Sequence, residues 1–63
     1  MMIKVTIGDE RGYVTLSTNY STIDRCLEKT DALVVKELCE YLTPTMREAQ
    51  MRVNGIDYYV EKI

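Results

Sequence analysis

The sequence has no histidine, no tryptophan and no phenylalanine, and only one proline, among its 63 residues. Histidine is the most frequent general base and the most frequent metal ligand in proteins, so the residue that most often performs these roles is absent. The three glycines, Gly8, Gly12 and Gly55, are too scattered to form a phosphate-binding loop. The sequence therefore predicts a protein that is not an enzyme and that holds no metal and no cofactor.

Long apolar runs and cysteine clusters are also missing. No run approaches the ~18 residues that a transmembrane helix needs, and Met1 leads directly into an alternating strand pattern rather than a signal peptide. The two cysteines, Cys26 and Cys39, are too few for a zinc site without histidine. We expect both to be buried thiols that act as small hydrophobic residues. These features predict a cytoplasmic protein that does not contact a membrane.

Charge of one sign is not in large excess. Ten acidic residues against eight basic ones give a formal charge of −2, and the acidic surplus falls within residues 22–43. No segment is basic, and nucleic-acid affinity comes largely from lysine and arginine that neutralise phosphates. Nucleic acid is therefore not the expected partner.

What the sequence does contain is typical of one small globular domain that spans residues 1–63. Apolar residues make up 46% of the chain and charged residues 29%. A chain of this length buries only about 60% of the surface that its unfolded form exposes. Its own core is therefore marginal, and a large enclosed active site is excluded.

The first segment predicts a β-hairpin. Residues 1–7 alternate between apolar and other side chains, and residues 13–17 do the same, which is the pattern of half-buried strands. Between them, residues 8–12 form a turn cluster with a glycine at each end. We expect a four-residue loop, which sets the register. The expected pairs are Ile7 with Gly12, Val5 with Val14 and Ile3 with Leu16.

The middle of the chain, from Ser21 to Thr43, predicts helix. Ser21 and Asp24 have the spacing of a capping box, and apolar residues then recur at helical intervals. Thr30 and Asp31 interrupt this stripe, so the region is either one helix of about twenty residues or two shorter ones. We favour one helix with a kink. Pro44 places the end of the helix just before it.

The last segment gives the clearest pattern. Residues 51–53 and 56–60 flank Asn54-Gly55, the dipeptide that best tolerates the positive backbone angles of a two-residue hairpin turn. This turn sets the pairing of the two strands and places Arg52 opposite Asp57 as an ion pair. The expected pairs on the apolar face are Val53 with Ile56, Met51 with Tyr58 and Ala49 with Val60.

Together these elements predict an α+β fold. Two hairpins laid side by side form a four-stranded, mainly antiparallel sheet, and one long helix, whole or broken, covers one face in a two-layer ββαββ arrangement. The expected sheet contribution to the core is Ile3, Val5, Ile7, Val14, Leu16, Met51, Val53, Ile56, Tyr58 and Val60.

All five aromatic residues are tyrosines, which suit half-exposed positions and are enriched at interfaces. The strand alternation places Tyr13 and Tyr59 on the sheet face away from the helix, together with Arg52. Three explanations compete for this arrangement: simple strand propensity, a protein-binding face, and a platform on which nucleic-acid bases stack.

The small size, the missing catalytic residues and the tyrosines predict a non-catalytic protein-binding module. We expect it to be a stoichiometric inhibitor or regulator of a larger protein, of the antitoxin-like or phage and mobile-element accessory type. The expected contact residues are Tyr13, Tyr59 and Arg52, with Tyr20 as an additional candidate.

Two alternatives remain open: a sheet-face binder of single-stranded nucleic acid and a structural homo-oligomeric subunit. A homodimer also fits the sequence, because edge residues of low charge, such as those from Tyr13 to Ser17, can extend a sheet across a two-fold axis.

Overall fold

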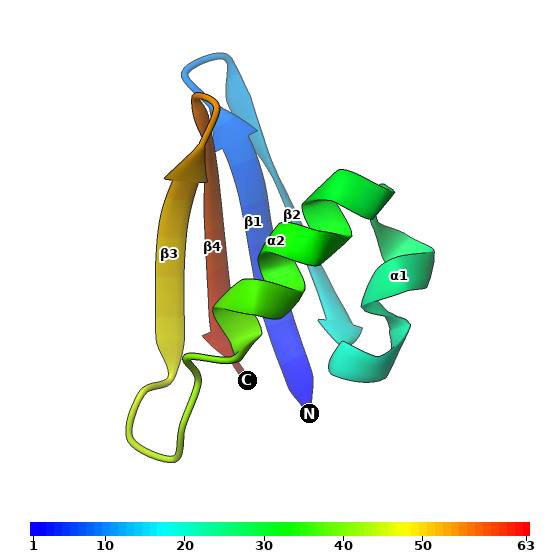
Figure 1. Ribbon diagram of the computed structural model, residues 1–63, viewed down its shortest axis with the longest axis vertical. Helices are drawn as coiled ribbons and strands as arrows, with labels where there is room; N and C mark the ends of the chain where they lie inside the picture. Colours follow the sequence, from blue (N-terminus) through cyan, green and yellow to red (C-terminus); the bar gives the residue numbers. More distant parts are fainter.

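Four strands form one antiparallel sheet, and the helices lie against a single face of it (Figure 1). The computed structural model describes residues 1–63. The neighbour order in the sheet is β2-β1-β4-β3, so β2 and β3 are the edge strands. The predicted α+β fold is confirmed. The elements are β1 (Met2–Asp9), β2 (Gly12–Asn19), the 3₁₀ helix η1 (Tyr20–Thr22), α1 (Ile23–Cys26), α2 (Lys29–Cys39), β3 (Glu48–Val53) and β4 (Ile56–Lys62).

The first hairpin forms as predicted, but its register differs from the expected one by two residues. Ile7 pairs with Val14 and Asp9 with Gly12, so the loop holds only Glu10 and Arg11. The tighter turn is stabilised locally, because Asp9 Oδ1 accepts a hydrogen bond of 2.8 Å from the Arg11 N–H and Gly12 adopts a φ of +146°. Since the side-chain period of a strand is two, the same residues still point to the core face.

The helical region is broken, and the break lies at Leu27 and Glu28 rather than at Thr30 and Asp31. Leu27 has an extended backbone, with φ −127° and ψ 155°, while residues 30 and 31 lie within the first turn of α2. This extended step allows the apolar residues of both helices to face the sheet: Ile23 in α1 and the buried stripe of α2. The prediction of one kinked helix was therefore wrong.

The expected capping box is also absent. The side chain of Asn19 caps η1 by accepting a hydrogen bond of 3.2 Å from the Ser21 N–H, and Ser21 Oγ donates to the same oxygen. Ser21 is thus bound to Asn19, two residues before it, and does not cap α1. The N-cap of α1 is Thr22, whose side chain makes no capping bond.

The second hairpin matches its prediction residue by residue. Val53 pairs with Ile56, and Arg52 pairs with Asp57. Asn54 and Gly55 have φ values of +51° and +80°, the left-handed conformations that a two-residue turn of this kind requires. The remaining expected pairs, Met51 with Tyr58 and Ala49 with Val60, are also present.

The buried hydrophobic residues come from α1, α2, β1 and β4, and the helices lie over the half of the sheet that is remote from the two hairpin turns (Figure 1). For this reason Val14, near the turn of the first hairpin, is 69% exposed instead of buried. Cys39 is buried as expected, whereas Cys26 is exposed. The fully buried hydrophobic residues are Ile3, Val5, Ile23, Ala32, Val35, Leu38, Cys39, Tyr58 and Val60; the remaining expected core residues, Ile7, Leu16, Met51, Val53 and Ile56, are partly buried against them.

The sequence predicts no transmembrane helix. Neither α1 nor α2 combines the length and the apolar content that a membrane-spanning helix requires. An ion pair between Asp24 in α1 and Lys36 in α2 links the two helices at the surface.

Candidate functional site

The sheet face opposite the helices has no element packed on it (Figure 1). Because side chains alternate along a strand, this open face carries the residues between the buried ones. They come from all four strands: Lys4, Thr6 and Gly8; Tyr13, Thr15 and Ser17; Asp57, Tyr59 and Glu61; Glu48, Gln50 and Arg52. We call this set the open face.

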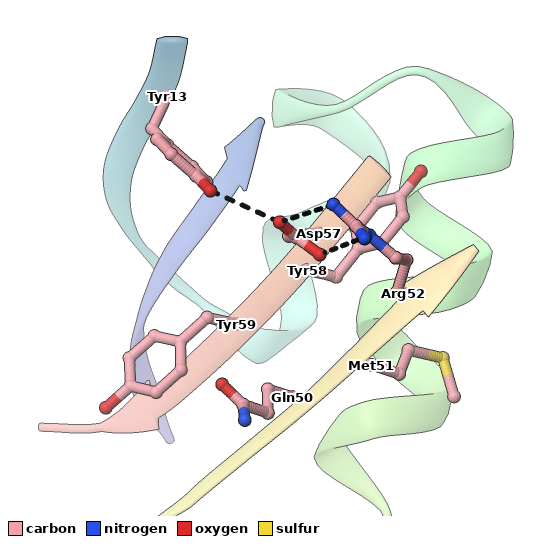
Figure 2. A pocket seen from close by; sticks show the side chains of 7 residues that line it. All are labelled: Tyr13, Gln50, Met51, Arg52, Asp57, Tyr58 and Tyr59. Carbon is pink, nitrogen blue, oxygen red and sulfur yellow. Dashed lines mark hydrogen bonds and ion pairs between the residues drawn. The ribbon is translucent and has the colours of Figure 1, made fainter. Parts of the chain in front are cut away.

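A chain of polar contacts runs across the open face near the hairpin turns. The Tyr13 hydroxyl donates a hydrogen bond of 3.2 Å to Asp57 Oδ2, and Arg52 Nε lies 2.9 Å from Asp57 Oδ1. Figure 2 shows both contacts meeting at the one carboxylate. Asp57 thus connects β2 to β3 across the sheet, and the Arg52–Asp57 pair predicted from the hairpin is confirmed.

Gly8 allows Tyr13 to reach Asp57. Gly8 lies on β1, paired with Tyr13 on one side and with Asp57 on the other. A Cβ atom at Gly8 would lie 2.6 Å from Tyr13 Cδ1 and 2.2 Å from the Gly12 carbonyl oxygen. The ring of Tyr13 therefore occupies space that any side chain at position 8 would need.

Tyr59 is held by a second carboxylate. Its hydroxyl donates a hydrogen bond of 2.8 Å to Glu48 Oε2 on β3, and this bond, with the charge of Glu48, raises the pKa of Tyr59 to about 12. The hydrogen bond to Asp57 likewise raises the pKa of Tyr13. The hydrogen bonds to Asp57 and Glu48 hold both rings in place from their hydroxyl ends.

These side chains surround a hollow of about 480 Å³ on the open face (Figure 2). Its wall includes Tyr13, Gln50, Arg52, Asp57 and Tyr59. The ring of Tyr58, which also borders it, points to the helix side, where its hydroxyl donates to Asp31 Oδ1 at 2.7 Å. The hollow is therefore bordered by the rings of Tyr13 and Tyr59 and by Arg52, whose charge is balanced by Asp57.

Three of the four predicted contact residues share this surface. Tyr13, Tyr59 and Arg52 all border the hollow. Tyr20 does not: it lies in η1, beyond the opposite end of β2, where its N–H donates to the Met1 carbonyl oxygen at 2.8 Å.

Sequence reasoning missed the part that Asp57 and Glu48 play in holding the tyrosines. The Tyr13–Asp57 contact joins residues 44 positions apart, and it depends on β1 and β4 being neighbours in the sheet. Nothing in the sequence indicates that strand order, so no local pattern could have revealed this contact.

No group of three or more cysteine and carboxylate side chains lies close enough together to hold a metal ion. Comparison of the chain with protein-family models, with curated proteins and with solved structures finds no match. The geometry of the open face is therefore the feature that bears most directly on function.

Proposed function

We propose that this protein is a small non-catalytic binding module that uses the open face to contact a larger protein and to regulate it as a stoichiometric partner. The observation that carries the proposal is the hollow between Tyr13 and Tyr59, with Arg52 at its rim, on the one sheet face that no helix covers. Tyrosine and arginine are among the residue types most enriched where proteins bind one another.

Preorganisation supports this proposal. Tyr13 is 59% exposed, yet its hydroxyl is bound to Asp57, and that of Tyr59 is bound to Glu48. A side chain that is already held in one position loses little conformational freedom when a partner binds, and the affinity rises accordingly. Simple strand propensity explains tyrosines in strands, but it does not require both hydroxyls to be anchored.

Charge favours a protein over single-stranded nucleic acid as the ligand. The open face carries two cations, Lys4 and Arg52, against the three carboxylates of Glu48, Asp57 and Glu61. Arg52 is already paired with Asp57. A surface that follows a phosphate backbone needs an excess of free lysine and arginine over acidic residues, and the open face has no such excess.

Affinity capture with matched variants tests the proposal. The tagged protein is incubated with lysate of its native host, and bound proteins are identified and quantified by mass spectrometry. A Tyr13→Ala/Tyr59→Ala variant should retain the fold, since both side chains are on the surface, and should recover at least about tenfold less partner, the loss expected when residues at the centre of an interface are truncated.

Tyr41→Ala is the control, because Tyr41 is as exposed as Tyr13 but lies outside the open face. Tyr20→Ala asks whether the fourth predicted contact belongs to the interface. Equal recovery of the partner by wild type and by a folded Tyr13→Ala/Tyr59→Ala variant contradicts the proposal. Oligonucleotide binding that falls steeply with salt supports the nucleic-acid alternative instead.

A further inference from the structure

The two edge strands of the sheet differ in how well they are protected from pairing with another chain. β3 carries charged side chains at Glu48 and Arg52. β2 has eight residues, none of them charged and none a proline, and it pairs with β1 without a bulge from Gly12 to Asn19. Proteins usually protect an edge strand with charge, proline or a bulge, and β2 has none of these.

The hydrogen-bonding pattern identifies which backbone groups of β2 are free. Tyr20 N–H donates to the Met1 carbonyl oxygen, and bonded pairs alternate along an antiparallel ladder. It follows that Gly12, Val14, Leu16 and Thr18 direct their N–H and C=O groups toward β1. The residues between them, Tyr13, Thr15, Ser17 and Asn19, direct theirs outward from the edge of the sheet, and of these groups the Asn19 carbonyl oxygen already accepts a hydrogen bond of 2.9 Å from Thr22 Oγ1.

We propose that β2 pairs with β2 of a second copy of this chain, antiparallel and across a two-fold axis, to form one eight-stranded sheet. Two copies of β2 can bond only through residues whose backbone groups point outward, and these are every second residue of the strand. The midpoint between any two of them falls on a residue, so the two-fold axis must pass beside a residue rather than between two residues. An axis at Leu16 pairs Thr15 with Ser17 of the second copy and Tyr13 with Asn19 of the second copy. This register uses the outward groups of Tyr13, Thr15 and Ser17 and the N–H of Asn19, and it brings no like charges together.

The surroundings of β2 favour a second copy over an unrelated strand. On the helix side, Val14 is 69% exposed beside a mostly apolar hollow of about 310 Å³ that is also lined by Leu16, Cys26 and Leu27. At the other end of β2, Thr18 Oγ1 lies 3.4 Å from Cys26 Sγ in α1. With the axis at Leu16, Val14 of each copy lies opposite Thr18 of the other. The end of β2 at Val14, which no helix covers, therefore lies beside the end of the second copy's β2 at Thr18, which is next to α1 of that copy.

The dimer leaves the proposed binding function intact. A two-fold axis perpendicular to the sheet keeps the helices of both copies on one side and both open faces on the other. Tyr59 and Arg52, on β4 and β3, lie away from the new contact. Tyr13 lies on β2 and pairs through its backbone, while its side chain stays on the open face, bonded to Asp57. The dimer inference can therefore fail while the proposed function stands, and the reverse is also true.

Sedimentation equilibrium with paired charge variants tests this inference. The wild type should sediment with twice the 7.3 kDa mass of the chain. Thr15→Lys/Ser17→Lys places ammonium groups opposite one another across the axis, and Thr15→Glu/Ser17→Glu places carboxylates there. Both side chains are exposed, so each variant should fold, and its measured mass should fall to half. An equimolar mixture of the two should recover the dimer mass, because opposite charges then face each other.

Gln50→Lys is the matched control, since Gln50 occupies the same kind of position on the other edge strand; it should remain dimeric. Val14→Glu serves as a single-site variant and should be monomeric. The inference is overturned by a wild type that stays monomeric at the highest concentration it reaches, or by dimers that persist in both charge variants. It is also overturned if the mixture of the two charge variants stays monomeric. Dissociation of the dimer by Gln50→Lys would place the interface on β3, and dissociation by Tyr59→Ala would place it on the open face; either result overturns the inference.

Discussion

Gly8 illustrates how one small residue organises a surface. Its missing side chain leaves room for the Tyr13 ring to cross β1 and for the hydroxyl to reach Asp57. The same gap accommodates the Gly12 carbonyl oxygen. Cross-strand packing of an aromatic ring over a glycine thus connects the first hairpin to the second on the open face.

Replacement of Gly8 by alanine should therefore destabilise the protein. The added methyl group would overlap both the Tyr13 side chain and the backbone of Gly12, and overpacking of this kind costs about 1–3 kcal/mol. Urea unfolding followed by circular dichroism measures the change. Ser17→Ala, on the same face but without crowded neighbours, should change the stability by less than about 0.5 kcal/mol. Equal stability of Gly8→Ala and wild type would show that the hairpin relaxes without cost.

Tyr58 should make the stability depend on pH in the alkaline range. Its side chain is only 3% exposed, and burial, together with the hydrogen bond to Asp31, raises its pKa to about 12. The folded state therefore favours the neutral phenol, while the unfolded chain ionises near pH 10. This contribution to stability is complete below pH 10 and is lost as the pH rises from 10 through about 12.

The comparison with Tyr58→Phe isolates this effect from other groups that titrate in the same range. At neutral pH the variant should be less stable by about 0.5–1.5 kcal/mol, because it lacks the hydrogen bond to Asp31. Urea unfolding at a series of pH values should show this difference shrinking above pH 10. A difference that stays constant across the range would mean that Tyr58 ionises equally in both states.

At the scale of elements, α2 supplies most of the cover for the sheet. It packs against β4 and β3 through a buried stripe that includes Val35 and Leu38. Leu38 is 2% exposed, whereas Leu33, on the opposite side of the same helix, is 59% exposed. Helix formation alone contributes little at this length, so this stripe is what holds α2 in place.

Leu38→Ala should cost about 2–5 kcal/mol, the usual loss when a buried leucine is truncated in a core. At about 0.05–0.15 kcal/mol of stability per residue, this loss is a large fraction of the total for a chain of 63 residues. We expect the urea midpoint of the variant, followed by circular dichroism, to fall well below that of wild type. Leu33→Ala is the matched control and should stay within about 0.5 kcal/mol of wild type. A cooperative, nearly wild-type unfolding curve for Leu38→Ala would contradict this account of the core.

The two hairpins show when local sequence is sufficient to predict an element. Asn54-Gly55 accepts one turn type, so the register of β3 with β4 follows from two residues. Residues 8–12 offer several turns, and the hydrogen bond between Asp9 and the Arg11 N–H selects the tightest one. The helix break at Leu27 was missed for a related reason. It depends on how the apolar residues of α1 and α2 pack on one sheet, and the spacing of apolar residues along the sequence does not show that packing.

At the scale of the whole molecule, the strand order decides what the protein presents. Placing β1 and β4 at the centre brings Tyr13, Asp57 and Arg52 next to one another on the open face and leaves the uncharged β2 at an edge. The same arrangement leaves Val14 beyond the cover of the helices. The proposed binding face and the proposed dimer contact both arise at this level.

The sequence by itself determined the two-layer α+β fold, the turn of the second hairpin and the face on which Tyr13, Tyr59 and Arg52 lie, because alternation and turn chemistry act between near neighbours in the chain. Only the tertiary structure decided the strand order, the anchoring of Tyr13 by Asp57, the separation of Tyr20 from the open face and the exposure of Val14 and Cys26. These features depend on contacts between segments far apart in the chain, and the physical reason is that packing, rather than local preference, sets which strands become neighbours.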